Sequence, residues 1–498
     1  MVAEGSQRSL APRRSAVRSG VATGISTLIV SASAAVAGAY LGHKFGRNAQ
    51  TDGFLAAYGV YLVLALAAQA FRLVIVPDLT RAEAEDRLTA ELVSYASAFL
   101  VVGIPATVLT WIFAESFGEA LTGSLPHSSA TIAANALRWL VPAAFGQLLG
   151  ALAASALAVR DSYVVAAVGY VVGAIASVVV FVAFAGSHGL IALAWGIALN
   201  TAFVLGIPLA ALVHYGHLGG SRRGGIAILP RLARLVQAAA VPLALQGIYL
   251  IALRAASGLG EGNQTSLTYA YLFAATLVAA TASSLSVISS APLTRRGIDA
   301  DSAAAHVAHA TWISLTLIGA AAGVFALVGG RVMSFVLGSA FKGDVGRQLG
   351  HLIVYLSPWM VTAVAFSVTF PLLFVLEKPR VLIPVAVAAL VVHVPITLVL
   401  RSALGLRGLA IAMGITELAV IVALMAAVSR RMLELSMVAL VRTSVAIAAL
   451  VLAAYGIPSL FLNGIEAALL GTVLYFGVLF ALRPRGLVDA WHYVRALH

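Results

Sequence analysis

The sequence predicts an all-α polytopic membrane protein, and its composition and apolar patterning carry that prediction. Hydrophobic residues make up 61% of the 498 positions, charged residues only 10%, and the mean hydropathy is +1.00. No soluble domain could bury so much apolar surface, so lipid is the solvent of most of the chain. The apolar stretches run for about 20 residues without alternation. Hydrocarbon permits only helices or closed barrels, so these stretches are predicted to be helices.

Fourteen apolar stretches have the length of transmembrane helices. At the ninth of them, Gly329-Gly330-Arg331 could either end the span or interrupt a longer helix. The predicted spans are 21–42, 54–76, 93–114, 132–157, 162–185, 190–214, 235–255, 266–290, 308–329, 350–376, 381–400, 408–429, 438–458 and 464–482.

The basic residues predict the orientation. With a cytoplasmic N-terminus, and with Arg254 and Arg442 assigned to the loops that their span ends adjoin, the cytoplasmic segments collect 21 of the 31 lysines and arginines and the external segments 8, while Arg72 and Arg138 are counted inside spans. This positive-inside bias predicts that both termini are cytoplasmic. It also explains the net charge of +12 without nucleic-acid binding. The apolar run after the first 20 residues is long for a signal peptide, which favours a retained first helix.

One motif occurs twice. Gln50 and Gln264 each lie in a polar turn, followed by one membrane-length apolar stretch, and Pro77 and Pro292 end those stretches. The glutamines are 214 positions apart and the prolines 215. A period this long predicts two similar six-helix halves. Six is even, so both halves enter the membrane in the same sense, related by a pseudo-two-fold along the membrane normal with the substrate path between them.

The predicted organisation follows from this repeat. Glu83, Arg87 and Glu91, at i, i+4 spacing between spans two and three, additionally predict a short solvated cytoplasmic helix over 81–91. The parts are a basic tail over 1–20, an N-terminal lobe over 21–215, a cytoplasmic linker over 216–234, a C-terminal lobe over 235–430, and two further helices with a C-terminal tail over 431–498.

The first hairpin carries a recognisable pattern. Phe45-Gly46 is followed by Thr51-Asp52-Gly53-Phe54, then by Ala57, Arg72, Val76-Pro77 and Leu79. This pattern resembles the first hairpin of the MviN-type lipid II flippases of the multidrug/oligosaccharidyl-lipid/polysaccharide (MOP) exporter superfamily. The second copy, Leu267–Tyr271, is similar to the stretch that opens the second helix of that superfamily's C-terminal lobe. His393 and Thr397 stand where relatives often carry two asparagines, before the turn of Gly405 and Gly408.

The resemblance covers nearly the whole chain and implies a function. It implies a flippase that moves a polyprenyl-diphosphate-linked cell-envelope glycan precursor across a bacterial cytoplasmic membrane by alternating access. Its expected partners are the lipid-linked glycan, membrane lipids and cell-envelope biosynthesis proteins. Lipid II flippases typically carry arginines along the first helix, and this chain has no lysine or arginine between Arg18 and Lys44. The resemblance therefore supports the fold and the flippase class for this chain more strongly than it supports lipid II as the substrate.

Ionisable and polar residues inside spans are the candidate cavity residues, because each costs about 2.5–3.5 kcal/mol at a helix centre. Arg138 has Asn135 one turn away and Gln147 deeper in the same span, and a guanidinium suits a phosphate. Arg72 can serve the cavity or extend to the cytoplasmic headgroups. Asp52, Arg47 and Arg254 lie at the outer mouth, where the simpler interpretation is that Asp52 caps span two.

Glu417 and His393 are the candidates for ion coupling. Glu417 lies near the centre of span twelve, and His393, with Thr397 one turn on, lies inside span eleven and is expected to face it. A carboxylate and an imidazole at mid-depth suit Na⁺ or H⁺ coupling, and a polar helix–helix contact is the alternative. With no cysteine and no clustered ligands, we expect no metal site and no cofactor beyond such an ion.

Other functions are weighed against the flippase. No phosphate-binding loop of the Gly-x(4)-Gly-Lys-Ser/Thr type is present, so energy must come from an ion gradient or the membrane potential. External loops are too short to hold an enzymatic domain, which argues against a glycosyltransferase. A cation-coupled drug or metabolite antiporter of the same fold and a transport-inactive cell-wall scaffold remain as alternatives.

Overall fold

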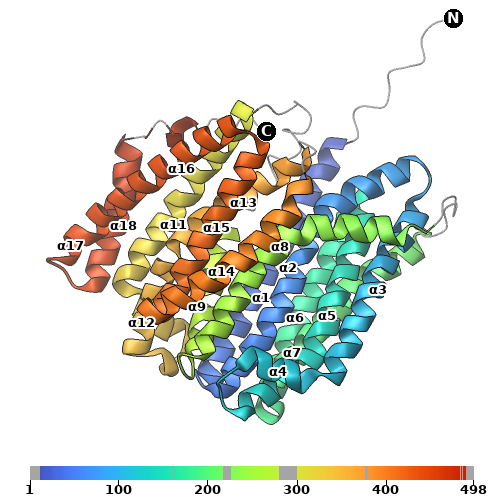
Figure 1. Cartoon of the computed structure of the whole chain (residues 1–498), viewed down its shortest axis with the longest axis horizontal. Helices are drawn as coiled ribbons and strands as arrows, with labels where there is room; N and C mark the ends of the chain where they lie inside the picture. Colours follow the sequence, from blue (N-terminus) through green and yellow to red (C-terminus); the bar gives the residue numbers. More distant parts are fainter. Residues whose placement is uncertain are drawn as a thin grey trace, which may run out of the picture. The chain divides into compact units, whose positions relative to one another are not determined.

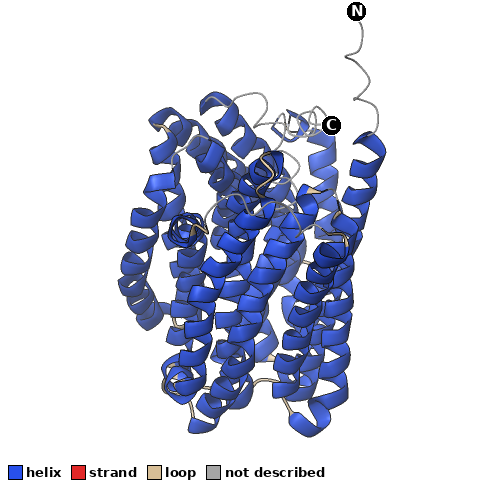
Figure 2. Ribbon diagram, turned by 90° about the vertical axis from the view of Figure 1, so that its right-hand side faces the viewer, coloured by secondary structure: helices blue, strands red, loops and turns tan. Residues whose placement is uncertain are grey.

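The computed structural model describes residues 12–160, 162–216, 226–279, 300–375, 379–482, 484 and 486–489. All regular structure in these residues is helical (Figure 2). Eleven of the helices described are long and apolar enough to cross a membrane, or up to twelve if the bent pair Asp344–Tyr355 and Ser357–Phe370 forms one span. The predicted all-α polytopic fold is therefore confirmed.

Where the connection between successive helices is described, it is short (Figure 1). Their bounds are α1 Pro12–Phe45, α2 Ala49–Ala84, α3 Leu88–Ile112, α4 Ala114–Thr122, α5 His127–Val159, α6 Tyr163–His188, α7 Ile191–His214, α8 Ile228–Ser257, α9 Asn263–Val278, α11 Ala300–Leu337, α12 Asp344–Tyr355, α13 Ser357–Val375, α14 Leu382–Leu404, α15 Leu406–Val428, α16 Arg430–Val451, α17 Ile457–Ser459 and α18 Gly464–Leu482.

Each of the predicted spans overlaps one of these helices. The span at 266–290 begins on α9, and its part beyond 279 lies outside the described residues, as do Pro292 and the linker residues 217–225. Gly329 and Gly330 do not end a helix, because α11 continues through them to Leu337. The span at 438–458 is α16, a π-helical turn over Leu452–Gly456 and α17. Helix ends differ from the prediction because polar residues extend several helices beyond their apolar stretch.

The chain divides into two compact units. Unit 1 comprises Met1–Leu41, Ala57–Leu121 and His127–Ala239, and unit 2 comprises Gly42–Ala56, Thr122–Pro126 and Ala240–His498. The boundaries thus fall inside α1, α2 and α8. The lobe boundaries and the pseudo-two-fold inferred from the repeat stay predictions.

Unit 1 is built around α5, which packs against α3 and α7, while α6 and α7 form a hairpin (Figure 1). α5 is rich in alanine and glycine, and these small residues let neighbouring backbones approach. Gly150, for example, lies against the Val204 backbone of α7. In contrast, α6 exposes an aliphatic stripe that includes Val168, Val172 and Ile175, as a lipid-facing helix does.

Unit 2 has α11 at its centre, in contact with α12, α13, α16 and α18, while α15 packs on α13, α14 and α16. α11 and α12 approach each other closely. Gly329 and Gly330 face Gly346 and Gly350, and their backbones touch without intervening side chains. Small residues four apart are a common device for close helix packing in membranes. The glycines that looked like a helix break in the sequence are therefore a packing surface.

Gly350→Val is expected to destabilise the protein. A Cβ at Gly350 would lie 2.9 Å from the Gly329 backbone, and a backbone cannot move aside as a side chain can. Overpacking of this kind costs about 1–3 kcal/mol. Thermal unfolding of the purified protein in detergent should show the loss. The matched control is Gly477→Val, where no atom lies within 4 Å of an added Cβ, so equal melting of both variants would contradict the packing argument.

Candidate functional site

The two copies of the repeated motif contact each other within unit 2. Asn48 precedes α2, and its Oδ1 accepts a hydrogen bond of 2.9 Å from the Thr51 backbone N–H. Asn48 therefore caps α2, as asparagine favours. The expectation that Asp52 caps its own helix is wrong, because Asn48 already satisfies that end and the Asp52 carboxylate turns to α9.

Asp52 caps the second copy of the motif. Its side chain is fully buried and accepts hydrogen bonds from the Gly262 N–H (2.5 Å), the Thr265 N–H (2.7 Å) and the Thr265 hydroxyl (2.5 Å). These N–H groups stand at the start of α9, where a helix leaves its first donors unsatisfied and carries partial positive charge. Gly262 has φ of +77°, which suits glycine. One carboxylate thus joins the N-termini of α2 and α9.

Arg47 completes this joint. Its Nε donates to the Gly262 carbonyl (2.8 Å) and the Ser266 hydroxyl (3.0 Å), and its guanidinium also reaches Asn263 Oδ1 at 3.3 Å. Burial lowers the pKa of the Arg47 guanidinium, and the charge of Asp52 opposes that shift. We call Arg47, Asp52, Gly262 and Thr265 the outer joint. Both sequence-predicted residues of the mouth are occupied in holding two helix ends together.

Arg254 lies at a neighbouring end of unit 2. It is in the last turn of α8, and its guanidinium donates to the Ser257 hydroxyl at 3.0 Å and lies against Gly123. Ser124 donates to the Ser257 carbonyl at 3.3 Å. Gly123 has φ of +65° and no room for a side chain beside the guanidinium. Arg254 therefore fixes the turn between α4 and α5 to α8.

The polar residues of α5 lie where the sequence placed them, in unit 1. The Arg138 guanidinium donates to Asn135 Oδ1 at 3.0 Å, and both side chains are at least partly exposed. Trp111 Nε1 donates to the Arg138 carbonyl at 2.9 Å. Gln147, deeper in α5 and half-buried, hydrogen-bonds to the Tyr61 hydroxyl. Arg138 therefore has donors left for a ligand.

Arg72 is half-buried on α2. It makes no hydrogen bond or ion pair with the residues that the structure describes. The tyrosines Tyr58 and Tyr61 lie on the same helix, and sequence reasoning missed them as site residues. The spacing of these two tyrosines could have revealed them. They lie three residues apart in the middle of a span, whereas the tyrosines of an aromatic belt lie at the membrane interface.

His393 and Glu417 lie in unit 2 but do not pair as expected. His393 is fully buried, with Nδ1 2.8 Å from the Thr416 hydroxyl and Nε2 3.0 Å from the Thr397 hydroxyl. The imidazole is thereby satisfied by two threonines on α14 and α15. The expectation that it faces Glu417 is wrong, since Thr416 and Glu417 are neighbours on a helix and point about 100° apart.

Glu417 has a separate environment on α15. Its side chain is 3% exposed and hydrogen-bonds to the Thr362 hydroxyl, and it lies near enough to Tyr271 to interact electrostatically. The second oxygen, Oε2, is buried without a hydrogen-bond partner. A buried carboxylate oxygen with no donor costs free energy unless it binds a proton or a cation. Glu417, not His393, therefore has the features of an ion-binding residue.

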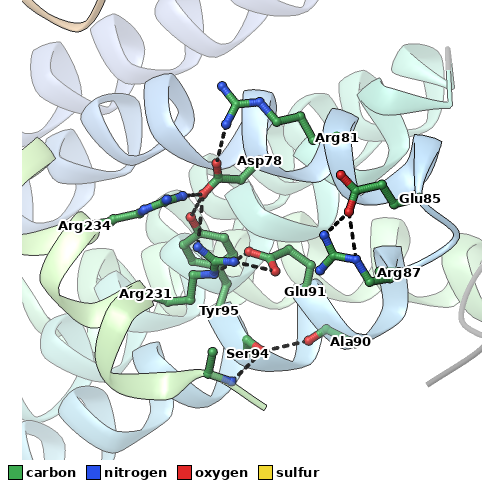
Figure 3. Close-up of polar contacts among 11 residues, drawn as sticks. Asp78, Arg81, Glu85, Arg87, Ala90, Glu91, Ser94, Tyr95, Arg231 and Arg234 are labelled. Carbon is green, nitrogen blue, oxygen red and sulfur yellow. Dashed lines mark hydrogen bonds and ion pairs between the residues drawn. The ribbon is translucent and has the colours of Figure 1, made fainter. Parts of the chain in front are cut away.

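A charge network ties the start of α8 to α2 and α3 within unit 1 (Figure 3). Asp78 accepts from Arg234 (2.5 Å) and from the Tyr95 hydroxyl (2.6 Å), with Arg231 at 3.5 Å. Arg231 also binds Glu91 through two nitrogens, with Nε 2.5 Å from Oε1 and Nη2 2.8 Å from Oε2. Asp78, Glu91, Tyr95, Arg231 and Arg234 are called the inner network.

The inner network corrects the predicted helix over 81–91. α2 continues to Ala84, a turn with Asp86 at φ of +55° follows, and α3 starts at Leu88. Glu91 is 5% exposed, so it is a buried partner of Arg231, not part of a solvated helix face. The i, i+4 spacing could not reveal this, because the partner lies 140 positions away.

The comparisons with known proteins identify the fold. Neither a model of a known protein family nor a curated protein sequence matches the chain. Among solved structures, lipid II flippase MurJ in an inward closed conformation superimposes with a TM-score of 0.74 at 13% identity, over 95% of this chain and 100% of that one. An inward-facing MATE multidrug resistance transporter gives 0.58 at 15%, over 86% and 98%. A MOP-superfamily transporter from Pyrococcus furiosus gives 0.56 at 16%, over 88% and 96%.

The chain therefore has the fold of the MOP-superfamily transporters. Within that class, its helices follow the course of the MurJ fold along the whole of the MurJ chain. The resemblance that the first hairpin and its repeat suggested is confirmed at the level of the fold. Sequence identities this low do not indicate which substrate this chain binds.

Asp52→Ala is expected to destabilise unit 2. The substitution leaves the Gly262 and Thr265 N–H groups buried without acceptors, a loss of about 1–3 kcal/mol. Asp52→Asn keeps one acceptor oxygen and should lose less. Thermal unfolding in detergent measures both, with Glu434→Ala, an exposed pair on α16, as control. An Asp52→Ala variant no less stable than the control would contradict the capping role.

Arg231 and Glu91 are expected to be strongly coupled. Removing one partner leaves a buried charge, which costs about 3–5 kcal/mol, whereas an exposed i, i+4 pair contributes about 0.3–0.5 kcal/mol. A double-mutant cycle of Arg231→Met and Glu91→Gln should therefore give a coupling free energy well above that of Arg430→Met and Glu434→Gln. Equal coupling in the two cycles would contradict a buried network.

Proposed function

We propose that the protein is a flippase for a polyprenyl-diphosphate-linked cell-envelope glycan precursor, working by alternating access in a bacterial cytoplasmic membrane. Lipid II and other lipid-linked oligosaccharides both fall within this class. The observation that carries the proposal is the superposition on the whole length of the MurJ flippase at a TM-score of 0.74, well above the values for the MATE transporters. The distribution of basic residues supports a cytoplasmic position for both chain ends.

The charges inside the spans of unit 1 support an anionic cargo. Arg72 and Arg138 are the arginines inside its predicted apolar stretches, and among the described residues the Arg138 guanidinium is bonded to Asn135 alone. Within the candidate spans of unit 1 that the structure describes, the one acidic residue is Glu91, near the start of α3, and its charge is already paired with Arg231. A guanidinium can bind a phosphate through two parallel hydrogen bonds. The diphosphate would thus be held by arginines while the lipid tail stays in the bilayer.

The outer joint, within unit 2, and the inner network, within unit 1, are proposed to hold helix ends together while the cargo moves. Both are sets of charge-assisted hydrogen bonds at helix ends. In this proposal the cargo headgroup enters from the cytoplasmic side, and the sugar is then exposed outside. The partners are the lipid-linked glycan, the surrounding lipids and the enzymes that make or use the glycan.

Glu417 is proposed to couple transport to an ion gradient, with Na⁺ or H⁺ as the ion. Its unpartnered Oε2 is the reason, since binding a proton or a cation would satisfy it. A membrane potential supplies about 2.3 kcal/mol per charge per 100 mV. His393 and Thr397 keep a structural role in this proposal, because they already satisfy each other.

A second candidate is a cation-coupled antiporter for drugs or metabolites. Glu417 favours it, since an organic cation would also pair with a buried carboxylate. The arginines of unit 1 argue against it, because they repel a cationic cargo. An efflux assay of cationic drugs in a sensitised host separates the two proposals.

Arg138→Ala is expected to slow flipping about tenfold or more, because one bidentate phosphate contact is worth at least 1.4 kcal/mol. Reconstituted proteoliposomes with a fluorescent polyprenyl-diphosphate saccharide and a membrane-impermeant quencher measure the rate. Arg331→Ala, an exposed arginine on α11, is the control. Wild-type protein that moves no lipid-linked sugar, or an Arg138→Ala variant with the wild-type rate, would overturn the proposed function.

Glu417→Gln is expected to abolish the dependence of the same rate on an imposed ion gradient. The amide keeps the volume and the hydrogen bond to Thr362 but can neither ionise nor bind a cation as strongly. Thr397→Val serves as a control in the His393 cluster, and it should keep gradient dependence. A Glu417→Gln variant that still responds to Na⁺ and to pH would remove Glu417 from the coupling mechanism.

A further inference from the structure

A cluster of phenols lies at membrane depth in unit 1. Tyr58 and Tyr61 of α2 stack with ring centroids 5.7 Å apart and an interplanar angle of 22°. The Tyr61 hydroxyl is hydrogen-bonded to Gln147 of α5, and Tyr170 of α6 interacts electrostatically with Tyr61. Tyr61 is 8% exposed, while Tyr58, Gln147 and Tyr170 are half-buried. Three helices therefore contribute to one aromatic and polar surface, called the tyrosine platform.

The tyrosines of the platform do not lie on a lipid-facing stripe of α2 or α6. On α6 the exposed aliphatic stripe includes Val168 and Val172, and Tyr170 is two positions, about 200°, from each, so it lies on the opposite side. α2 exposes no large apolar side chain among the residues whose side chains are described. Tyr58, Tyr61 and Tyr170 thus lie away from the exposed aliphatic side chains of their helices.

The chemistry of the platform matches an uncharged sugar ring. The face of an aromatic ring attracts the slightly positive C–H groups on one side of a pyranose, and phenol and amide groups can exchange hydrogen bonds with its hydroxyls. Phenol faces also attract cations, but Glu91, the one carboxylate in the candidate spans of the described part of unit 1, is already paired with Arg231. An apolar lipid tail, by contrast, has no group that could exchange hydrogen bonds with the phenols and the amide.

We propose that Tyr58, Tyr61, Tyr170 and Gln147 form a binding site for an uncharged sugar ring, the saccharide part of the transported lipid. This inference rests on the proposed flippase function and narrows its substrate class. Arg138 precedes Gln147 by nine residues on α5, about 13 Å along the axis. The phosphate and the saccharide of one headgroup would therefore be recognised at different depths of the same helix.

Binding to the full-length protein in lipid nanodiscs tests the proposal with two probes. One is a short-chain polyprenyl diphosphate that carries a single N-acetylhexosamine, and the other is the same diphosphate without sugar. Wild-type protein is expected to bind the glycosylated probe about tenfold more tightly. Tyr58→Ala and Tyr170→Ala should lose most of this preference while binding the bare diphosphate within about twofold of wild type, which also checks that they fold. Tyr58→Phe should retain the preference, since the ring is kept.

Tyr215→Ala, an exposed tyrosine at the end of α7, is the matched control and should behave as wild type. If Tyr58→Ala and Tyr170→Ala keep the full preference for the glycosylated probe, the platform is overturned and the flippase proposal stands. Wild-type protein that binds the two probes equally also overturns the platform alone. Wild-type protein that binds neither probe overturns the flippase proposal with it. Binding of tetraphenylphosphonium that is lost in Tyr58→Ala would assign the platform to cations and overturn the sugar site.

Discussion

In hydrocarbon a polar group without a partner is expensive, and the polar contacts of this protein follow from that constraint. The outer joint is the clearest case. The first turn of α9 leaves several N–H groups unsatisfied, and Asp52 of another helix supplies three hydrogen bonds to it. Arg47 then satisfies the carbonyl of Gly262 and keeps the carboxylate from being an isolated charge. Because the cap comes from a distant segment, the apolar stretch of α9 needs no polar residue of its own for this purpose.

The same constraint separates residues that carry structure from residues that are free to act. Asp78 and Glu91 bind arginines or a phenol, and His393 has two threonine partners, so these groups are satisfied without any ligand. Glu417 differs, because one oxygen is buried and unpartnered. Arg138 differs too, since Asn135 is the one acceptor that its guanidinium meets in the part of the chain that the structure describes. Unsatisfied bonding capacity, and not the mere presence of a charge in a span, marks the functional candidates.

The fold was largely predictable from the sequence, because apolar length and basic loops depend on local composition. The repeat of Gln50 and Gln264 predicted similar halves, and its two copies turned out to touch. Partners far apart in the sequence were not predictable. The spacing of Glu83, Arg87 and Glu91 suggested a solvated helix, whereas Glu91 is paired with Arg231 from α8. Asp52 likewise caps α9 instead of α2, which no local pattern could reveal. The rotation of each helix about its own axis was also not predictable. Thr416 and Glu417 differ by about 100° around α15, and it is Thr416 that contacts His393.

The polar inventory of unit 1 bears on what kind of cargo the fold can take. The first helix has no lysine or arginine between Arg18 and Lys44, although the lipid II flippases that the chain resembles typically have arginines there. A headgroup with several carboxylates would then meet only Arg72 and Arg138 at membrane depth, and each further anion would be desolvated without a counter-charge. A headgroup with one diphosphate and neutral sugars asks for fewer cations and more hydrogen-bonding and stacking surface. In the proposed flippase the tyrosine platform would supply that surface, so the absence of arginines from the first helix and the presence of the platform both favour a cargo of lower charge.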